Sequence, residues 1–125
     1  MINLNDPQVW WFATRASAIL AWVLLTVSLV LGVLLRTRIM RGADDPDWLK
    51  SIHRFSSSLA VIMVVIHLVT LYLDEYIEFE IGDLLIPFQT DYKTDGVAVG
   101  IFAVYLLVAV VLSSWMMNSL PQPLW

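Results

Sequence analysis

The sequence predicts an all-α membrane protein with three transmembrane helices, and three observations support this fold class. Hydrophobic residues make up 59% of the 125 residues, whereas charged residues make up only 14%. Three apolar runs each reach the length of about 20 residues that a helix needs to cross the hydrocarbon core of a bilayer. The rest of the chain is too short for a soluble domain, which needs at least roughly 50 residues. We therefore expect residues 1–125 to form a single transmembrane domain that contacts the lipid bilayer.

The first predicted helix covers residues 9–35. Trp10 and Trp11 stand at its start, where amphipathic rings favour the headgroup level of a membrane. Arg15 follows about one turn later, so its long aliphatic stem can extend back to the interface. Residues 16–35 carry no charge. Because no basic segment precedes this run and no small-residue cleavage site follows it, we interpret it as a retained helix and not as a signal peptide.

The second predicted helix covers residues 49–73, and the third covers residues 97–117. The second contains both histidines of the chain, and the third contains no charge. Two prolines follow the third helix, and proline ends a helix because it lacks a backbone N–H. Between these helices, the apolar stretch 83–88 is suited to lie on the membrane surface. Its proline and the glycine before it argue against a long regular element.

The connecting segments differ in charge, and this difference predicts the topology. The first connection, counted together with Arg54 at its border, holds five of the seven basic residues: Arg36, Arg38, Arg41, Lys50 and Arg54. The second, residues 74–95, holds Lys93 among seven acidic residues. Since cytoplasmic loops carry an excess of Lys and Arg, we predict a cell-membrane protein with its N-terminus outside and its C-terminus in the cytoplasm. The acidic connection is either a solvated face or an attractor for a cationic substrate such as ferric ion.

Net charge and cysteine content exclude several classes of function. The net charge is −4, so the chain has no basic surface of the kind that binds nucleic acid. It contains no cysteine, so it forms no disulfide, thiolate nucleophile, iron–sulfur cluster or cysteine-ligated zinc site of its own.

The two histidines, His53 and His67, are the candidate metal ligands. They are fourteen residues apart on one predicted helix, a rotation within about 40° of four full turns, so both point to nearly the same face. Their separation along the axis is roughly 21 Å, one toward each membrane boundary. This geometry suits two haem irons stacked across the membrane, because haem iron commonly takes an axial histidine. The alternative is an interfacial histidine at residue 53 and a helix-packing hydrogen bond at residue 67.

Other residues near the histidines have both a cofactor interpretation and a structural one. The serine run 56–58 leaves room for a flat macrocycle or, alternatively, lets a neighbouring helix approach closely. Arg54 is suited to pair with a haem propionate on the cytoplasmic side, and Arg15 with one on the outer side. Both arginines are equally explained as anchors at the membrane interface.

The chain resembles the ferric-reductase-like transmembrane domain, a superfamily that includes ferric reductases, NADPH oxidases and the haem subunit of periplasmic methionine-sulfoxide reductase. The resemblance is carried by Ile52-His53-Arg54-Phe55, by small residues after it and by His67. Supporting features are Arg15 with a small-residue start to the first helix, Gly32 near its end, the stretch Asp83-Leu84-Leu85-Ile86-Pro87-Phe88, and Ser113-Ser114 with the proline-containing segment 120–125. It extends over essentially the whole chain.

The resemblance implies a larger haem-binding helix bundle that carries electrons across the membrane through two b-type haems. His53 would ligate the haem on the cytoplasmic side and His67 the haem on the outer side. The partner histidines of this family would lie on a helix after residue 125, so coordination within these residues is incomplete. Either the chain is a truncated version, or a second subunit supplies the other ligands, or haem is not bound stably.

An oxidoreductase role would therefore need partners, and no residue of the chain is expected to act as an acid, base or nucleophile. The sequence has no G-x-G-x-x-G segment or other nucleotide-binding domain, so an external electron donor is required. The alternative function is a membrane anchor or assembly subunit of a larger complex, without a redox role. A colourless protein that tolerates replacement of either histidine would favour this alternative.

Overall fold

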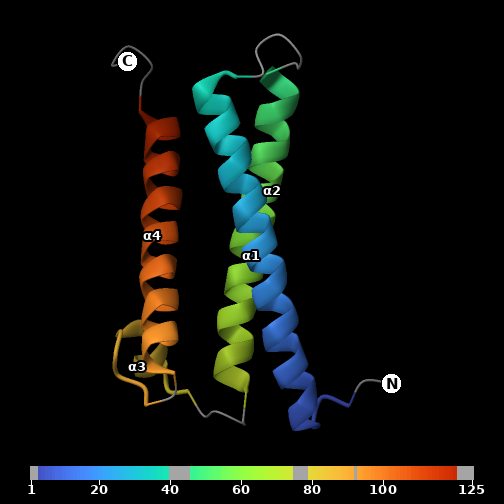
Figure 1. The fold of residues 1–125 in the computed structure, drawn as a ribbon, viewed down its shortest axis with the longest axis vertical. Coiled ribbons are helices and arrows are strands. Elements are labelled where there is room, and N and C mark those ends of the chain that lie inside the picture. The colour runs from blue at the N-terminus through green and yellow to red at the C-terminus, as the bar shows by residue number, and fades with distance from the viewer. Residues whose placement is uncertain (1–2, 40–45, 75–78, 92, 121–125) are drawn as a thin grey trace. The chain divides into compact units, whose positions relative to one another are not determined.

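The structure, a computed structural model, describes residues 3–39, 46–74, 79–91 and 93–120. Over these residues the chain forms helices and no strands (Figure 1). The helices are α1 (Pro7–Thr37), α2 (Pro46–Leu73), α3 (Ile81–Leu85) and α4 (Thr94–Ser119). Helices α1, α2 and α4 are long and apolar enough to cross a membrane, which confirms the predicted fold class. They contain the three predicted spans, and where their ends differ they extend two or three residues further.

The extended ends of α1 have local causes. The side chain of Asp6 accepts a hydrogen bond from the Gln8 backbone N–H at 3.0 Å, which caps the first turn. Pro7 suits the first helical position because its missing N–H would have no partner within the helix. At the other end Arg38 adopts a left-handed conformation with φ of 55°, and its N–H donates to the Leu34 carbonyl at 3.1 Å. This geometry ends the helix and satisfies one of its terminal carbonyls.

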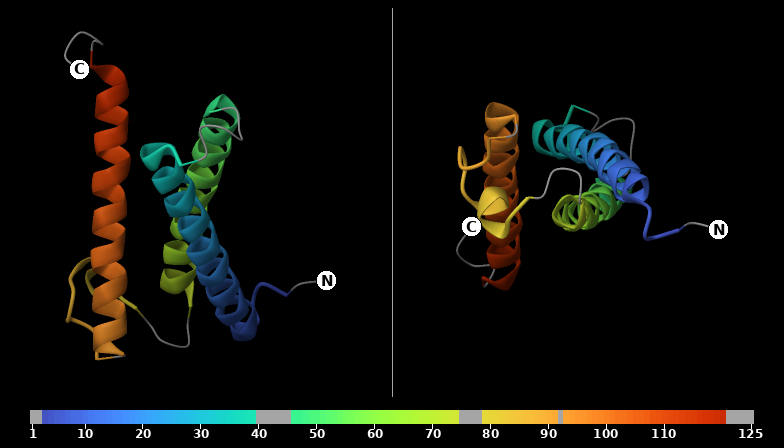
Figure 2. Two further views of the ribbon diagram at one scale, coloured as in Figure 1. Left: turned by 45° about the horizontal axis from the view of Figure 1, so that its top comes forward. Right: turned by 90° about the horizontal axis from the view of Figure 1, so that it is seen from below.

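The chain divides into two compact units, Met1–Glu78 with α1 and α2, and Phe79–Trp125 with α3 and α4. In the first unit α1 and α2 run antiparallel and lie side by side, as Figures 1 and 2 show. We call this pair the α1–α2 hairpin. Its connected end is where α1 ends and α2 begins, and its open end is where α1 begins and α2 ends. The candidate site described below belongs entirely to this hairpin.

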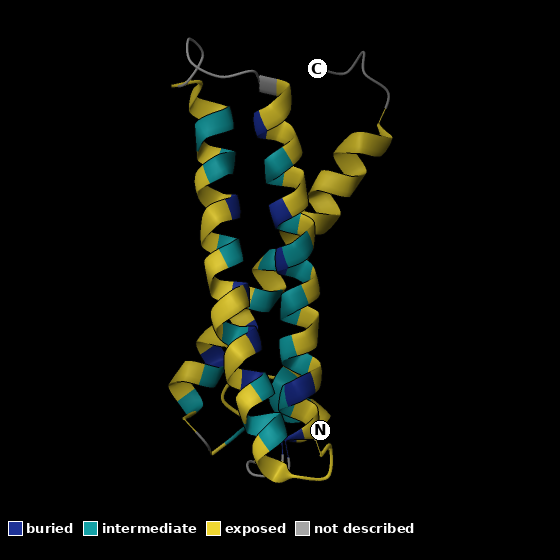
Figure 3. Cartoon of the chain, turned by 90° about the vertical axis from the view of Figure 1, so that its right-hand side faces the viewer, coloured by how far each residue is buried: buried dark blue, intermediate teal, exposed yellow. Residues whose placement is uncertain are grey.

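Small side chains form the contact between α1 and α2. The buried residues of α1 are Thr14, Ser17, Ala21 and Ser28, and those of α2 are Leu49, Ser56, Ala60 and Thr70. In Figure 3 these buried positions follow the facing sides of the two helices. Several recur at steps of seven residues, the spacing that keeps side chains on the seam of two closely packed helices. Because small residues let backbones approach closely, this seam suits a helix pair in lipid.

The second unit is held together by contacts between α4 and the segment before it. The Tyr105 hydroxyl donates a hydrogen bond to the Leu85 carbonyl. The rings of Phe88 and Phe102 meet edge to face, with centroids 6.5 Å apart. Helix α3 is a single short helix of five residues, so the apolar stretch 83–88 contains no long regular element.

Most large apolar side chains of the described helices are exposed. Trp22 and Leu29 on α1 are each 69% exposed, and Leu106 on α4 is 68% exposed. A soluble protein rarely exposes such extensive apolar surface, whereas lipid tails are a favourable environment for it. The burial pattern therefore agrees with a multi-pass membrane protein.

Candidate functional site

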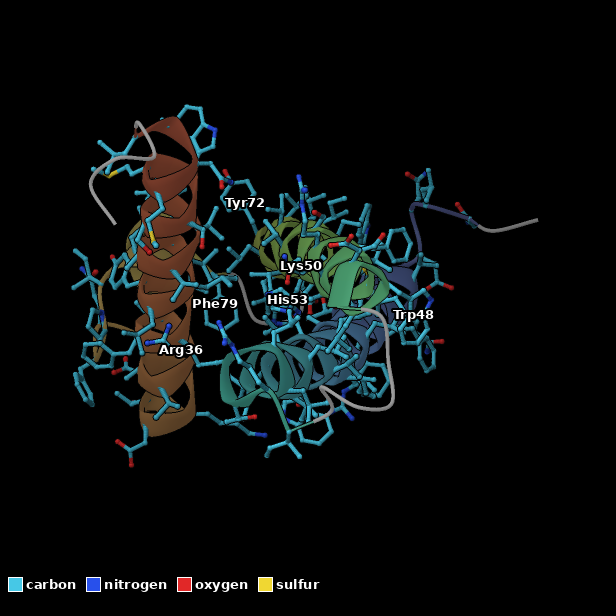
Figure 4. All side chains as sticks on the ribbon, turned by 90° about the horizontal axis from the view of Figure 1, so that it is seen from above. Arg36, Trp48, Lys50, His53, Tyr72 and Phe79 are labelled. Carbon is cyan, nitrogen blue, oxygen red and sulfur yellow. The ribbon has the colours of Figure 1, made fainter. Side chains whose placement is uncertain are left out.

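His53 contacts the main chain of α1 near the connected end of the hairpin. Its Nδ1 lies 2.9 Å from the Ser28 carbonyl oxygen. Figure 4 shows His53 on the side of α2 that faces α1. The ring is only partly exposed, because α1 covers it. His53 is thus held between two helices, a contact that neither interpretation of this residue included.

His67 makes the same kind of contact near the open end. Its Nδ1 lies 3.1 Å from the Thr14 carbonyl oxygen. The Ser17 hydroxyl lies 3.4 Å from the same Nδ1 and 3.5 Å from the Thr70 hydroxyl, so a small polar cluster surrounds the ring. The helix-packing hydrogen bond considered for this residue is therefore present, with a backbone acceptor.

The two contacts share one register between the helices. The acceptors Thr14 and Ser28 are fourteen residues apart on α1, and the donors His53 and His67 are fourteen residues apart on α2. Since the helices are antiparallel, equal steps in opposite directions keep the pairs matched. The hairpin thus contains two similar histidine sites, one above the other, separated by roughly 21 Å along the axis.

The hydrogen bonds decide which ring nitrogen can bind a metal. A carbonyl oxygen can only accept, so each Nδ1 carries the proton and donates it. In the neutral ring Nε2 then keeps its lone pair, and within the described part of the chain neither Nε2 has a hydrogen-bond partner. A histidine that donates one ring N–H to a carbonyl is the usual arrangement for metal ligation through the other nitrogen. Each ring is therefore held by α1 through Nδ1, and Nε2 is its unprotonated nitrogen.

Hydroxyl groups on α2 follow each histidine in a repeated pattern. Ser56 donates to the His53 carbonyl at 3.1 Å, and Thr70 donates to the His67 carbonyl at 2.9 Å. Each lies three residues after its histidine and is buried at the α1 contact. These hydroxyl groups bond to backbone carbonyls of α2 and not to the imidazole rings.

The serine run makes helix contacts. The Ser57 hydroxyl donates to the His53 carbonyl at 2.6 Å and lies 2.5 Å from the Ser28 hydroxyl on α1. Ser58 is exposed and donates to the carbonyl of Arg54 in its own helix. Of the two interpretations given for this run, close approach of a neighbouring helix is the one for which the structure shows contacts.

The two arginines lie on exposed surface. Arg54 borders an open depression together with Asp47, Lys50 and Ser51, at the start of α2. Arg15 places its guanidinium carbon 4.0 Å from the centroid of the Trp11 ring, a cation–π contact. This contact favours the membrane-anchor interpretation for Arg15, and the position of Arg54 next to His53 leaves it available to an anionic group.

Sequence reasoning found both histidines but missed their partners on α1. The signal was present, because Thr14 and Ser28 show the same fourteen-residue spacing as the histidines. Thr14 also has a buried hydroxyl oxygen without a hydrogen-bond partner among the described residues. Over those residues no group of three or more His, Asp or Glu side chains gathers to hold a metal.

The fold and the site together define a multi-pass helical membrane protein whose hairpin presents two carbonyl-bonded histidines on one helix. Comparisons of the chain with protein-family models, with curated proteins and with solved structures found no match.

Proposed function

We propose that this chain is a haem-binding transmembrane electron-transfer domain of the ferric-reductase-like type. The observation that carries the proposal is the pair of Nδ1 hydrogen bonds from His53 and His67 to carbonyls of α1. With Nδ1 engaged, each histidine keeps the lone pair of its Nε2 atom, and the two histidines stand at equivalent positions in the register of α1 and α2.

The donor set fits haem b. Neutral imidazole is a common axial ligand of haem iron, and a carbonyl-bonded ring is held in one orientation. When bound, haem b supplies a one-electron redox centre. The protein's part is to hold His53 and His67 rigidly, which the seam of small residues between α1 and α2 achieves. Neither histidine needs to transfer a proton in this role.

The spacing of the two sites fits transport across a bilayer. The roughly 21 Å between the histidines compares with the ~30 Å thickness of the hydrocarbon core. One site thus lies toward each membrane face. We assign the connected end to the cytoplasm and the N-terminus to the outside, because Arg36, Arg38, Lys50 and Arg54 gather at the connected end.

Complete coordination requires a group from outside these residues. Each site has one histidine from this chain, so a second subunit or further helices would supply the other axial ligand. An external donor would supply the electrons. Arg54 would pair with a propionate of the haem at the His53 site, since Arg54 is exposed and directly follows His53 in the sequence.

The test is a haem titration of the full chain in detergent or nanodiscs, followed by a reduced-minus-oxidised absorption spectrum. The wild-type chain should give a b-type signal that decreases stepwise in His53→Ala and in His67→Ala and is lost in the double variant. The exposed neighbours Phe55→Ala and Ile66→Ala are matched controls and should keep the signal.

A wild-type chain that binds no haem under these conditions would contradict the proposal. Unchanged spectra in both histidine variants would contradict the assignment of ligands. Either result would favour the alternative, a membrane anchor or assembly subunit without a redox role.

A further inference from the structure

Gly32 on α1 lies next to the His53 ring, on the side of its Cε1 atom. A Cβ atom added at Gly32 would lie 3.2 Å from His53 Cε1, and 3.8 and 3.9 Å from Nδ1 and Nε2. A contact of 3.2 Å is tighter than an ordinary van der Waals contact, so a methyl group here must push the ring outward by a few tenths of an ångström. A larger residue at position 32 would thus limit how closely this histidine approaches α1.

The closeness of Gly32 to the ring follows from the hydrogen bond of His53. In an α-helix the carbonyl of each residue points along the axis toward the residue four positions later. The Ser28 carbonyl therefore points toward Gly32. A ring that donates to this oxygen at 2.9 Å must lie against position 32.

The equivalent position in the register of the second site is Ala18. Ala18 lies four residues after Thr14, the acceptor for His67, and fourteen residues before Gly32. Here a methyl group occupies the position that is empty at Gly32. The distance from Nδ1 to the carbonyl oxygen is 3.1 Å at this site and 2.9 Å at the other.

A second difference between the sites is a hydroxyl group. Ser17 lies 3.4 Å from the Nδ1 of His67, whereas the equivalent position on α1 near His53 is Leu31, which has no hydroxyl. The His67 ring thus has an additional polar neighbour. Among the described residues, the Nδ1 of His53 has the Ser28 carbonyl as its hydrogen-bond partner.

We infer that Gly32 is a positioning residue for His53. The two histidine sites are inequivalent because position 32 is a glycine, whereas the corresponding position 18 is an alanine. Gly32 acts through His53, by allowing its ring to approach the Ser28 carbonyl. The contact is a property of the chain itself, and its consequence for a bound haem rests on the proposed function.

The experiment uses the full chain without haem, with ¹⁵N-labelled histidine, in nanodiscs. Gly32→Ala should weaken the Nδ1–H hydrogen bond of His53 and shift its ring resonances, while those of His67 stay in place. Ala18→Gly should do the reverse and strengthen the hydrogen bond of His67. The control is Gly100→Ala on α4, the same substitution at a glycine with nothing within 4 Å of the added Cβ.

A loss of helix in α1 does not explain the expected result. Alanine is a better helix former than glycine, so Gly32→Ala does not weaken α1 itself. If Gly32→Ala leaves the His53 resonances unchanged, or shifts both histidines equally, the inference is overturned. A response to Gly100→Ala as large as that to Gly32→Ala would overturn it as well.

A haem titration of the same variants separates this inference from the proposed function. Gly32→Ala should weaken binding at the His53 site by about tenfold, the lower end of the effect of residues that orient a metal ligand, and leave the His67 site unchanged. If the wild-type chain binds no haem but the resonances shift as expected, the proposed function fails and the positioning role stands. If haem binds and neither readout responds to Gly32→Ala, the positioning role fails.

Discussion

His53 and Ser28 are 25 residues apart in the sequence and meet through a hydrogen bond of 2.9 Å between a ring nitrogen and a main-chain oxygen. Because the acceptor belongs to the backbone, the orientation of the ring depends on the register between α1 and α2 and not on the side chain at position 28. The contact between Thr14 and His67 has the same character. This dependence on register leads to the predictions below.

The first prediction concerns the tautomer of the two histidines. Both rings should carry the proton on Nδ1, because a carbonyl oxygen accepts from that nitrogen. Ser28→Ala should leave the tautomer of His53 unchanged, since the acceptor remains. Histidine ¹⁵N resonances of the chain in nanodiscs would measure this. A proton on Nε2 of either ring would contradict the assignment of that nitrogen as the ligand.

The second prediction concerns the packing of the hairpin. Ala60 is 0% exposed and faces α1, so Ala60→Leu would force the helices apart and should destabilise the chain by about 1–3 kcal/mol. Unfolding in mixed micelles with increasing denaturing detergent would measure the loss. The control is Ala103→Leu on α4, where the side chain is exposed and should tolerate the larger group. Equal stability of the two variants would argue against a tight α1–α2 seam.

The third prediction separates two adjacent serines. Ser57 contacts the Ser28 hydroxyl on the other helix, whereas Ser58 is exposed and bonds only within α2. Ser57→Ala should therefore destabilise the hairpin by about 0.5–1.5 kcal/mol, as for other interhelical hydrogen bonds, and Ser58→Ala by less. The same unfolding assay applies. A larger effect of Ser58→Ala would show that the run serves another contact.

The fourth prediction tests the proposed orientation in the membrane. The chain has no cysteine, so single cysteines can be introduced without a background signal. Asn5→Cys and Gln89→Cys should react with a membrane-impermeant maleimide on intact cells. Ser51→Cys, at the connected end, should react only after lysis. All three positions are exposed. The reverse labelling pattern would show that the chain has the opposite orientation in the membrane.

Much of the fold could be predicted from local sequence. The three spans follow from apolar runs, because the length and hydropathy of one segment decide whether it can cross a bilayer. The helix boundaries shifted by two or three residues because capping by Asp6 and an initial proline extend a helix beyond its apolar core. The common face of His53 and His67 also follows from local information, since the period of an α-helix is constant.

The contacts of the two histidines with α1 could not be predicted from the sequence, because they depend on tertiary structure. Which carbonyls of α1 meet His53 and His67 is decided by the register of two helices, and small residues at repeated steps are compatible with more than one register. The contact of Gly32 with the His53 ring is likewise invisible in the sequence, where this glycine is one small residue among several. The sequence by itself determined the three apolar helices and the histidine pair, because both depend on the period and hydropathy of single segments. Only the tertiary structure decided the tautomer and the fit of each ring, because these depend on atoms that are far apart in the chain.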